Sequence, residues 1–216
     1  MTVRGKLFLC EGVDAAGKAT HSKLFTNHLQ SLGRKAVRMS FPNYTTMTGK
    51  AILGHLKGEW TVEHTPPAFS EPINHTVDID ALVFQSLMTM NRYEVSMDMD
   101  LTLHNGTDIV LDRYWPSGYA YGLADGLPEQ WLIVVHEMLP PVDCAVLLDI
   151  PPEESVRRRP ERRDRYEKQA GLMETVRGNY KTIFADQAAQ GRPWTVVDAL
   201  GTKDEVQDRI RKELLG

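Results

Sequence analysis

The chain has 216 residues, of which 42% are hydrophobic and 25% charged, and its formal net charge is −4. The acidic balance argues against general nucleic-acid binding, and no run reaches the roughly 18 apolar residues of a membrane span. The N-terminus has no signal-peptide pattern, and the length predicts one domain over residues 1–216 with a sizeable core.

Two cysteines, Cys10 and Cys144, lie far apart in sequence, each within a short apolar run. We expect both to be reduced core residues, not a disulfide or a metal pair, which is typical of a cytoplasmic protein.

The first predicted element is a short buried strand, formed by the apolar run from Leu7 to Cys10. It breaks at Gly12, and an amphipathic helix is predicted over 17–32. The loop between them, GVDAAGK, has two glycines and a following Lys18 in the phosphate-binding pattern. Glycine lets the backbone N–H groups wrap closely around an anion, and the helix N-terminus and the lysine add positive charge. The loop therefore predicts a phosphate site; the alternative is an ordinary glycine-rich turn.

The position after Lys18 departs from the phosphate-loop pattern. It is normally Ser or Thr, whose hydroxyl binds magnesium, but here it is Ala19, and Thr20 points about 100° away around the helix. Either other groups and water hold the metal, or phosphoryl transfer has been lost.

Strands and helices alternate along the rest of the chain. Further strands are expected at 36–41, 108–111, 144–150 and 194–197. Helices are expected at 46–56, 78–104, within 118–139 (one or two), from 152, at 173–190 and at 204–215. This alternation predicts an α/β fold whose parallel sheet is covered by helices on both faces.

Asp112 and Arg113 follow the apolar run Ile109–Leu111 directly. Open α/β sheets bind ligands at the carboxyl ends of their strands, so Asp112 can hold magnesium or orient a nucleophile there. Arg113 could bind a second anion through a two-pronged contact. The alternative is an ordinary ion pair at a strand end.

Arginines are concentrated in one nine-residue segment, at Arg157, Arg158, Arg159, Arg162, Arg163 and Arg165. Such a segment could be a solvated face, but its arginines and proline suit a mobile flap over phosphates, at about 157–168. Arg158 and Arg162 are the first candidates for a catalytic contact. Arg92 lies within the helix predicted at 78–104, and its alternative is a surface arginine with a buried stem.

Six motifs occur in order: EGVDAAGKAT from Glu11 to Thr20, Phe41-Pro42, NRYE from Asn91, Asp112-Arg113-Tyr114 with Ser117-Gly118, DRYE from Asp164, and Val197-Asp198-Ala199. Together they resemble the thymidylate kinase family of nucleoside monophosphate kinases, over nearly the whole chain.

The resemblance implies a P-loop kinase fold with a five-stranded parallel sheet. It also implies a homodimer that transfers the γ-phosphate of ATP to dTMP with Mg2+. Donor-binding residues would be Gly12, Asp14, Ala15, Ala16, Gly17, Lys18, Ala19 and Thr20 at the phosphates, and Asp198 and Ala199 near the adenine. Acceptor-binding residues would be Asp14, Phe41, Pro42, Met88, Arg92, Arg113, Ser117, Gly118, Tyr121 and Tyr166. Asp112 would serve the magnesium and the transfer step.

Three positions differ from many members of the family. Tyr44 stands where relatives often have an arginine for the acceptor phosphate, and Met88 stands where an aromatic ring covers the thymine. Ala15 replaces an arginine that some members carry inside the loop, and the arginine-rich segment resembles the arrangement that supplies this cation from the flap.

Two alternatives remain at this point: a kinase of unphosphorylated deoxynucleosides, and a nucleotide-binding regulator that has lost transfer. The preferred base of the acceptor is also open.

Overall fold

The computed structural model describes residues 3–62, 78–159 and 170–216. Within these ranges the chain forms one five-stranded sheet, in the order β2-β3-β1-β4-β5 with every neighbouring pair parallel. The strands are β1 (Leu7–Glu11), β2 (Ala36–Ser40), β3 (Asp108–Asp112), β4 (Cys144–Asp149) and β5 (Trp194–Asp198). The predicted fold class is confirmed.

Strands β1 and β3 lie at the centre of the sheet, and every residue in them is buried. Both faces of a parallel sheet are covered, which explains why these strands are almost continuously apolar. Cys10 pairs with Asp112, and Ser40 pairs with the same residue from the other side. The carboxyl ends of β1, β2 and β3 therefore meet at one edge of the sheet.

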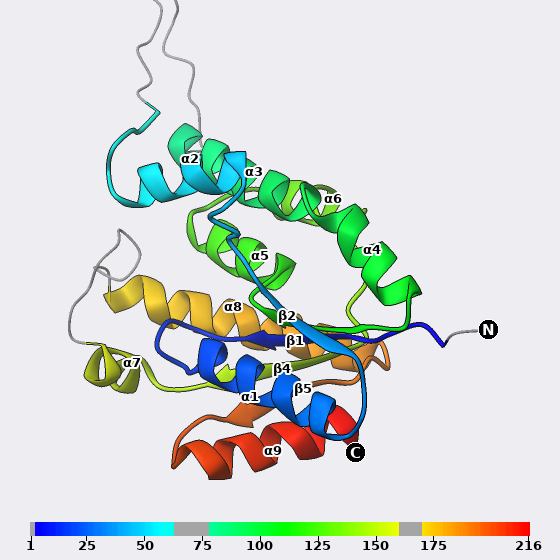
Figure 1. Ribbon diagram of the computed structural model, residues 1–216. Helices are drawn as coiled ribbons and strands as arrows, with labels where there is room; N and C mark the ends of the chain where they lie inside the picture. The colour runs from blue at the N-terminus through cyan, green and yellow to red at the C-terminus, as the bar shows by residue number, and fades with distance from the viewer. Residues whose placement is uncertain (1–2, 63–77, 160–169) are drawn as a thin grey trace, which may run out of the picture.

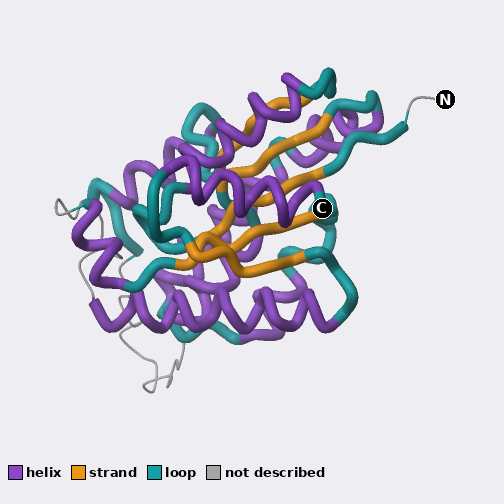
Figure 2. Tube along the Cα trace, turned by 90° about the horizontal axis from the view of Figure 1, so that it is seen from below, coloured by secondary structure: helices purple, strands orange, loops and turns teal. Residues whose placement is uncertain are grey.

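Helices cover both faces of the sheet (Figures 1 and 2). On one face, α1 (Lys18–Ser31) and α9 (Lys203–Leu215) pack beside each other. The other face carries α5 (Trp115–Ala124) and α8 (Ala170–Ala189), and α4 (Ser96–His104) contacts β3 on that side. The other helices are α2 (Met47–Leu56), α3 (Ile79–Tyr93), α6 (Glu129–Val134) and α7 (Pro152–Arg158).

The single helix predicted over 78–104 is in fact two helices, α3 and α4, and that prediction was wrong. The chain leaves helical geometry at Val95, where φ is −116° and ψ is 2°. Just before it, Glu94 turns its carboxylate to α2 and accepts a 2.6 Å hydrogen bond from the Thr48 hydroxyl. The break thus falls next to a side-chain contact between α2 and the end of α3.

Cys10 and Cys144 are both free and buried, as expected. Among the described residues, no helix is long and apolar enough to cross a membrane.

Candidate active site

The loop after β1 has the backbone that its glycines predict. Gly12 and Gly17 have φ values of 144° and 97°, in the range that favours glycine. A Cβ atom at Gly12 would lie only 2.6 Å from the carbonyl oxygen of Leu148 on β4, so no side chain fits there. Ala15 also has a positive φ, of 59°, which is unfavourable for a residue with a Cβ.

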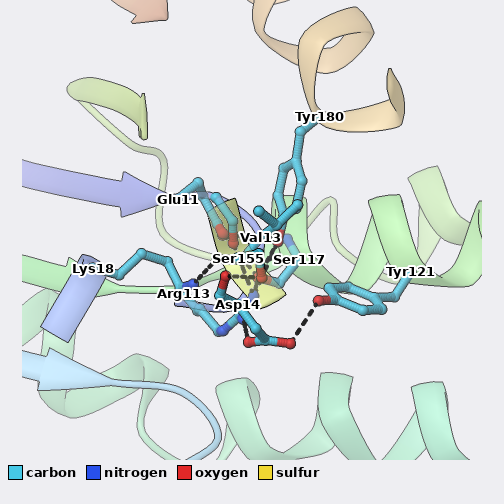
Figure 3. A network of polar contacts seen from close by, with 10 residues as sticks. Glu11, Val13, Asp14, Lys18, Arg113, Ser117, Tyr121, Ser155 and Tyr180 are labelled. Carbon is cyan, nitrogen blue, oxygen red and sulfur yellow. Dashed lines mark hydrogen bonds and ion pairs between the residues drawn. The ribbon is translucent and has the colours of Figure 1, made fainter. Parts of the chain in front are cut away.

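Lys18 is buried, with 7% of its surface exposed, and its Nζ donates a 2.7 Å hydrogen bond to the carbonyl of Val13 (Figure 3). Without ligand, a lysine that binds outer phosphates would be expected to face solvent, and that expectation is wrong here. The lysine side chain turns back toward the loop because the carbonyl oxygen of Val13 there accepts its hydrogen bond. Burial, together with the nearby Arg113, lowers the pKa of Lys18 to about 8, although acidic neighbours partly oppose this.

Asp112 stands at the end of β3, as predicted, and is nearly buried. Its Oδ2 atom accepts a 2.6 Å hydrogen bond from Nη2 of Arg38 on the neighbouring strand β2. Arg38 in turn donates through Nε to the Ser22 hydroxyl on α1, at 2.8 Å. The sequence reasoning missed Arg38; a charged residue inside a predicted strand of the sheet was the available signal.

The residues here suit a magnesium ion bound mainly through phosphates and water. The described residues contain no group of three or more His, Cys, Asp or Glu side chains that could hold a metal by itself. Mg2+ commonly keeps several waters and takes only one or two carboxylates besides substrate phosphates. Asp112 faces the loop closely enough to act on the charge of Lys18, so it can supply such a carboxylate without a hydroxyl at Ala19.

Arg113, the residue after Asp112, has a positive φ of 67°. Its side chain lies across the end of β1, where Nη1 donates to the carbonyl of Gly12. Its Nη2 donates to Oδ1 of Asp14 in the phosphate loop, forming a salt bridge with both side chains largely buried. The Tyr121 hydroxyl donates to the other oxygen of Asp14 at 3.3 Å. Burial alone would lower the pKa of Arg113 and raise that of Asp14, but their mutual attraction moves both the other way, so the pair is ionised.

A buried polar network lies behind Arg113 (Figure 3). Glu11, the last residue of β1, accepts hydrogen bonds from the backbone N–H of Tyr114 at 2.7 Å and the Ser117 hydroxyl at 2.8 Å. Tyr180 on α8 contacts Ser117 with its hydroxyl at 2.7 Å, and also accepts from Arg113 at 3.2 Å. Burial raises the pKa of Glu11 even though Arg113 opposes this. Glu11 and Tyr180 were not predicted as site residues; Glu11 could have been noticed as an acid that ends an apolar strand.

Arg92 is fully buried on α3, so the alternative of a surface arginine is excluded. Its Nη1 donates to the carbonyl of Met88 at 3.0 Å, whereas Nε and Nη2 have no hydrogen-bond partner among the described residues. A Cβ atom on Gly118 would lie 3.0 Å from Nη1, which shows that α5 approaches the guanidinium closely. Burial lowers the pKa of Arg92 to about 10. Buried donors without partners are costly, and a bound polar ligand could satisfy them.

Three further predicted acceptor residues, Phe41, Pro42 and Met88, are among the described residues. Phe41 is buried, with its ring 5.5 Å from that of Tyr114, and Pro42 follows it after a cis peptide bond. Asn43, not noticed in the sequence, is tied to α3 by a 2.7 Å hydrogen bond from its backbone N–H to Asn91. Met88 is partly buried against the core.

The arginine-rich segment is described only as far as Arg159. Arg158 donates to the carbonyl of Ala199 at 2.9 Å and, at 3.4 Å, to that of Ala15 in the phosphate loop. Ser155, one turn earlier on α7, donates to the carbonyl of Asp14 at 2.7 Å. Helix α7 is therefore hydrogen-bonded directly to the phosphate loop, at the carbonyl groups of Asp14 and Ala15. Arg157 and Arg158 both pair with Glu154 at 2.6 Å, but the Arg157 side chain is otherwise exposed.

Arg162 and Tyr166 fall outside the described residues, so their predicted contacts are not described. Asp198 ends β5, and Ala199 is buried beside Arg158. The structure thus brings together six predicted residues at the carboxyl edge: Lys18, Asp112, Arg113, Asp14, Ser117 and Tyr121. Arg158 reaches the phosphate loop from α7.

Comparison with known proteins gives one consistent result. The family model described as thymidylate kinase matches residues 10–210. Thymidylate kinase of Danio rerio is 31% identical over 209 residues, covering 96% of this chain and 89% of the relative. That of Schizosaccharomyces pombe is 28% identical over 207 residues, covering 96% and 90%.

The same likeness extends to an archaeal relative and to a solved structure. A probable thymidylate kinase of Pyrococcus abyssi is 28% identical over 220 residues, covering 99% of this chain and all of the relative. The thymidylate kinase structure from Candida albicans, described for its broad substrate specificity, matches with a TM-score of 0.79 at 26% identity. That match covers 98% of this chain and 92% of the other.

Proposed function

The chain belongs to the thymidylate kinase family, and we propose that it transfers the γ-phosphate of ATP to dTMP, giving dTDP and ADP. The observation that carries this proposal is a pair of cations beside Asp14. Lys18 lies inside the phosphate loop and Arg113 at the end of β3, each close enough to influence the ionisation of Asp14. Two separate cationic positions suit a reaction in which a phosphoryl group passes between two phosphates.

The donor phosphates would lie along the loop from Gly12 to Thr20. Backbone N–H groups at the start of α1 would point toward them, and Lys18 would leave the carbonyl of Val13 for the outer phosphates. Asp112 would hold Mg2+ through water or directly, and the bound ion would supply positive charge that offsets the negative charge of the phosphates. The base of ATP would lie near Asp198 and Ala199.

The acceptor would lie between α3 and α5. Arg92 would satisfy its open donors on the base, with Met88 and Phe41 packing nearby, and Ser117, Gly118 and Tyr121 would line the pocket. Arg113 would bind the acceptor phosphate and Asp14 would face the sugar. Tyr166 would complete the site from the flap.

Ala15 leaves no cation at that position of the loop, so we propose that the arginine-rich flap supplies one. Arg158 already contacts the carbonyl of Ala15, and a change of rotamer would turn its guanidinium toward a bound phosphate. Arg162 is the second candidate, from its position in the sequence.

We also propose that two copies of the chain form a dimer through the face made by α3, α4 and α6. Met90 on α3 and Met97 and Leu101 on α4 are all more than half exposed. Met138, just after α6, is 84% exposed, and Tyr93 bonds to the carbonyl of Val135, so the two parts adjoin. Free, buried cysteines support a reducing location such as the cytoplasm.

The test is an acceptor screen with ATP and Mg2+ across dTMP, dUMP, dCMP and dGMP, with the product identified by chromatography. The proposal expects dTDP as the main product and ADP in equal amount. Absence of transfer to every monophosphate would contradict it, and preference for another pyrimidine would keep the reaction class but change the base.

A further inference from the structure

Tyr180 holds a position behind Arg113 that none of the roles above uses. It lies on α8, fully buried, and its hydroxyl reaches the end of β3. The two residues are 67 positions apart in sequence, yet Nη1 of Arg113 lies 3.2 Å from the tyrosine oxygen. The question is what this hydroxyl does beside the proposed acceptor-phosphate arginine.

The hydrogen bonds around Tyr180 have one consistent direction when Glu11 is ionised. A carboxylate only accepts, so the proton of the Ser117 hydroxyl goes to Oε2 of Glu11, 2.8 Å away. Ser117 must then accept from Tyr180, 2.7 Å away, and the tyrosine oxygen accepts from Arg113. The chain therefore runs from the guanidinium, which can only donate, to a buried carboxylate, which can only accept.

This chain fixes one end of the guanidinium. Nη1 of Arg113 has Tyr180, Ser117 and the carbonyl of Gly12 as acceptors, at 3.2, 3.2 and 3.3 Å. Nη2 is held instead by Asp14 in the phosphate loop. An arginine anchored at Nη1 keeps its plane while Nη2 exchanges a carboxylate for a phosphate, and pre-organised groups bind more tightly.

We propose that Tyr180 is a positioning residue for the acceptor phosphate, acting through Arg113 as the end of the chain Arg113–Tyr180–Ser117–Glu11. The proposal rests on the proposed function, because it assumes a monophosphate acceptor at Arg113. Tyr180 itself contacts no substrate in this account. Its effect should be confined to ligands that carry a phosphate on the nucleoside.

The decisive variant is Tyr180→Phe, which removes one oxygen and keeps the ring that packs edge-on to Tyr121 at 6.5 Å. Loss of this hydrogen bond to a charged group should raise the KM for dTMP about tenfold. The KM for ATP should stay within about twofold, since Lys18 and the loop are untouched. By calorimetry, dTMP should bind more weakly, whereas thymidine, which has no phosphate, should bind as before.

The matched control is Tyr119→Phe on α5. Its hydroxyl donates to the exposed Glu129 at 2.6 Å and takes no part in the chain, so all these constants should be unchanged. A double-mutant cycle with Arg113→Lys adds a second measure: if Tyr180 acts through Arg113, the two losses should be clearly less than additive. If Tyr180→Phe fails to fold, Ser117→Ala interrupts the same chain one link further and is judged by the same dTMP-to-thymidine ratio.

The outcomes separate the two claims. An unmodified protein that does not phosphorylate dTMP contradicts the proposed function. A normal dTMP kinase in which Tyr180→Phe leaves the dTMP constants unchanged, or weakens thymidine and dTMP equally, contradicts the positioning role alone.

Discussion

Arg38 and Asp112, on neighbouring strands, form a salt bridge at the edge of the sheet where the phosphate loop begins, with 2.6 Å between Nη2 and Oδ2. Ser22 fixes the other side of the guanidinium. One carboxylate oxygen of Asp112 is thus bound to Arg38, and the other, Oδ1, is the oxygen that would accept a hydrogen bond from a magnesium-bound water.

The first prediction follows from this pair. Arg38→Met should lower kcat by about tenfold, worth about 1.4 kcal/mol, because Asp112 loses the group that orients it. The change in melting temperature should be small, since a partly exposed pair is worth about 0–1 kcal/mol.

Arg34→Met is its control. Arg34 pairs with Asp108 at the opposite end of the same strand, also at 2.6 Å, far from the loop. Its loss should reduce stability and leave kcat unchanged. Equal kcat values for Arg38→Met and the unmodified protein would show that catalysis does not depend on the contact between Arg38 and Asp112.

The second prediction concerns the protonation of Lys18. Its pKa of about 8 in the free protein lies below the ordinary 10.5, so above pH 8 the lysine is increasingly neutral. Bound phosphates favour the charged form, so ATP binding near pH 8.5 should take up protons, measured by calorimetry in buffers of different ionisation enthalpy.

Lys18→Met should abolish that uptake and lower kcat by about 100-fold or more. Folding of the free protein has the opposite proton balance to ATP binding. Between pH 8 and 10.5 the unfolded chain holds more protons at Lys18 than the folded chain does, so the contribution of Lys18 to the free energy of unfolding increases as pH rises through this range. ATP binding without proton uptake at pH 8.5 would show that Lys18 is already fully charged.

The third prediction concerns Arg92, a buried cation whose Nε and Nη2 lack described partners. Arg92→Met should leave the ligand-free protein as stable or more stable, because it removes a buried charge that is poorly satisfied. The same change should raise the KM for dTMP by about tenfold or more, through loss of hydrogen bonds to the base. Thermal denaturation and dTMP kinetics test this; a large fall in melting temperature with unchanged KM would make Arg92 a structural residue.

The fourth prediction concerns the flap. Arg158→Ala should lower kcat by about tenfold with a modest change in ATP affinity, as for a contact made mainly in the transition state. Arg157→Ala is the control, since that side chain is exposed and pairs with Glu154 only among the described residues. Arg162→Ala is measured alongside. If none of the three variants lowers kcat, the segment is a solvated surface.

The phosphate loop and the sheet could be predicted because their signals are local. Gly12 and Gly17 meet backbone demands set within a few residues, and buried strands such as Ile109–Leu111 carry their own apolar runs. The strand-end position of Asp112 followed directly from such a run.

Arg38 and Tyr180 escaped prediction because their contacts join distant parts of the chain. Arg38 contacts Asp112 across 74 positions and Tyr180 contacts Ser117 across 63. A charge inside a strand draws attention to Arg38, but no local pattern identifies the partner of either residue. The exposure of Lys18 was misjudged for a related reason: its partner is a loop carbonyl, that of Val13, which only the folded loop places in reach. The break at Val95 likewise adjoins a contact between distant residues, the hydrogen bond from Thr48 on α2 to Glu94.

The central claim is that the acceptor is a nucleoside monophosphate bound through Arg113. The most direct measurement is kcat/KM of the unmodified protein for dTMP and for thymidine, at saturating ATP and Mg2+, repeated with Arg113→Ala. The account predicts a preference for dTMP of about 100-fold or more in the unmodified protein, reduced strongly in the variant, because a charged phosphate contact is lost. Equal use of thymidine and dTMP by the unmodified protein would contradict it.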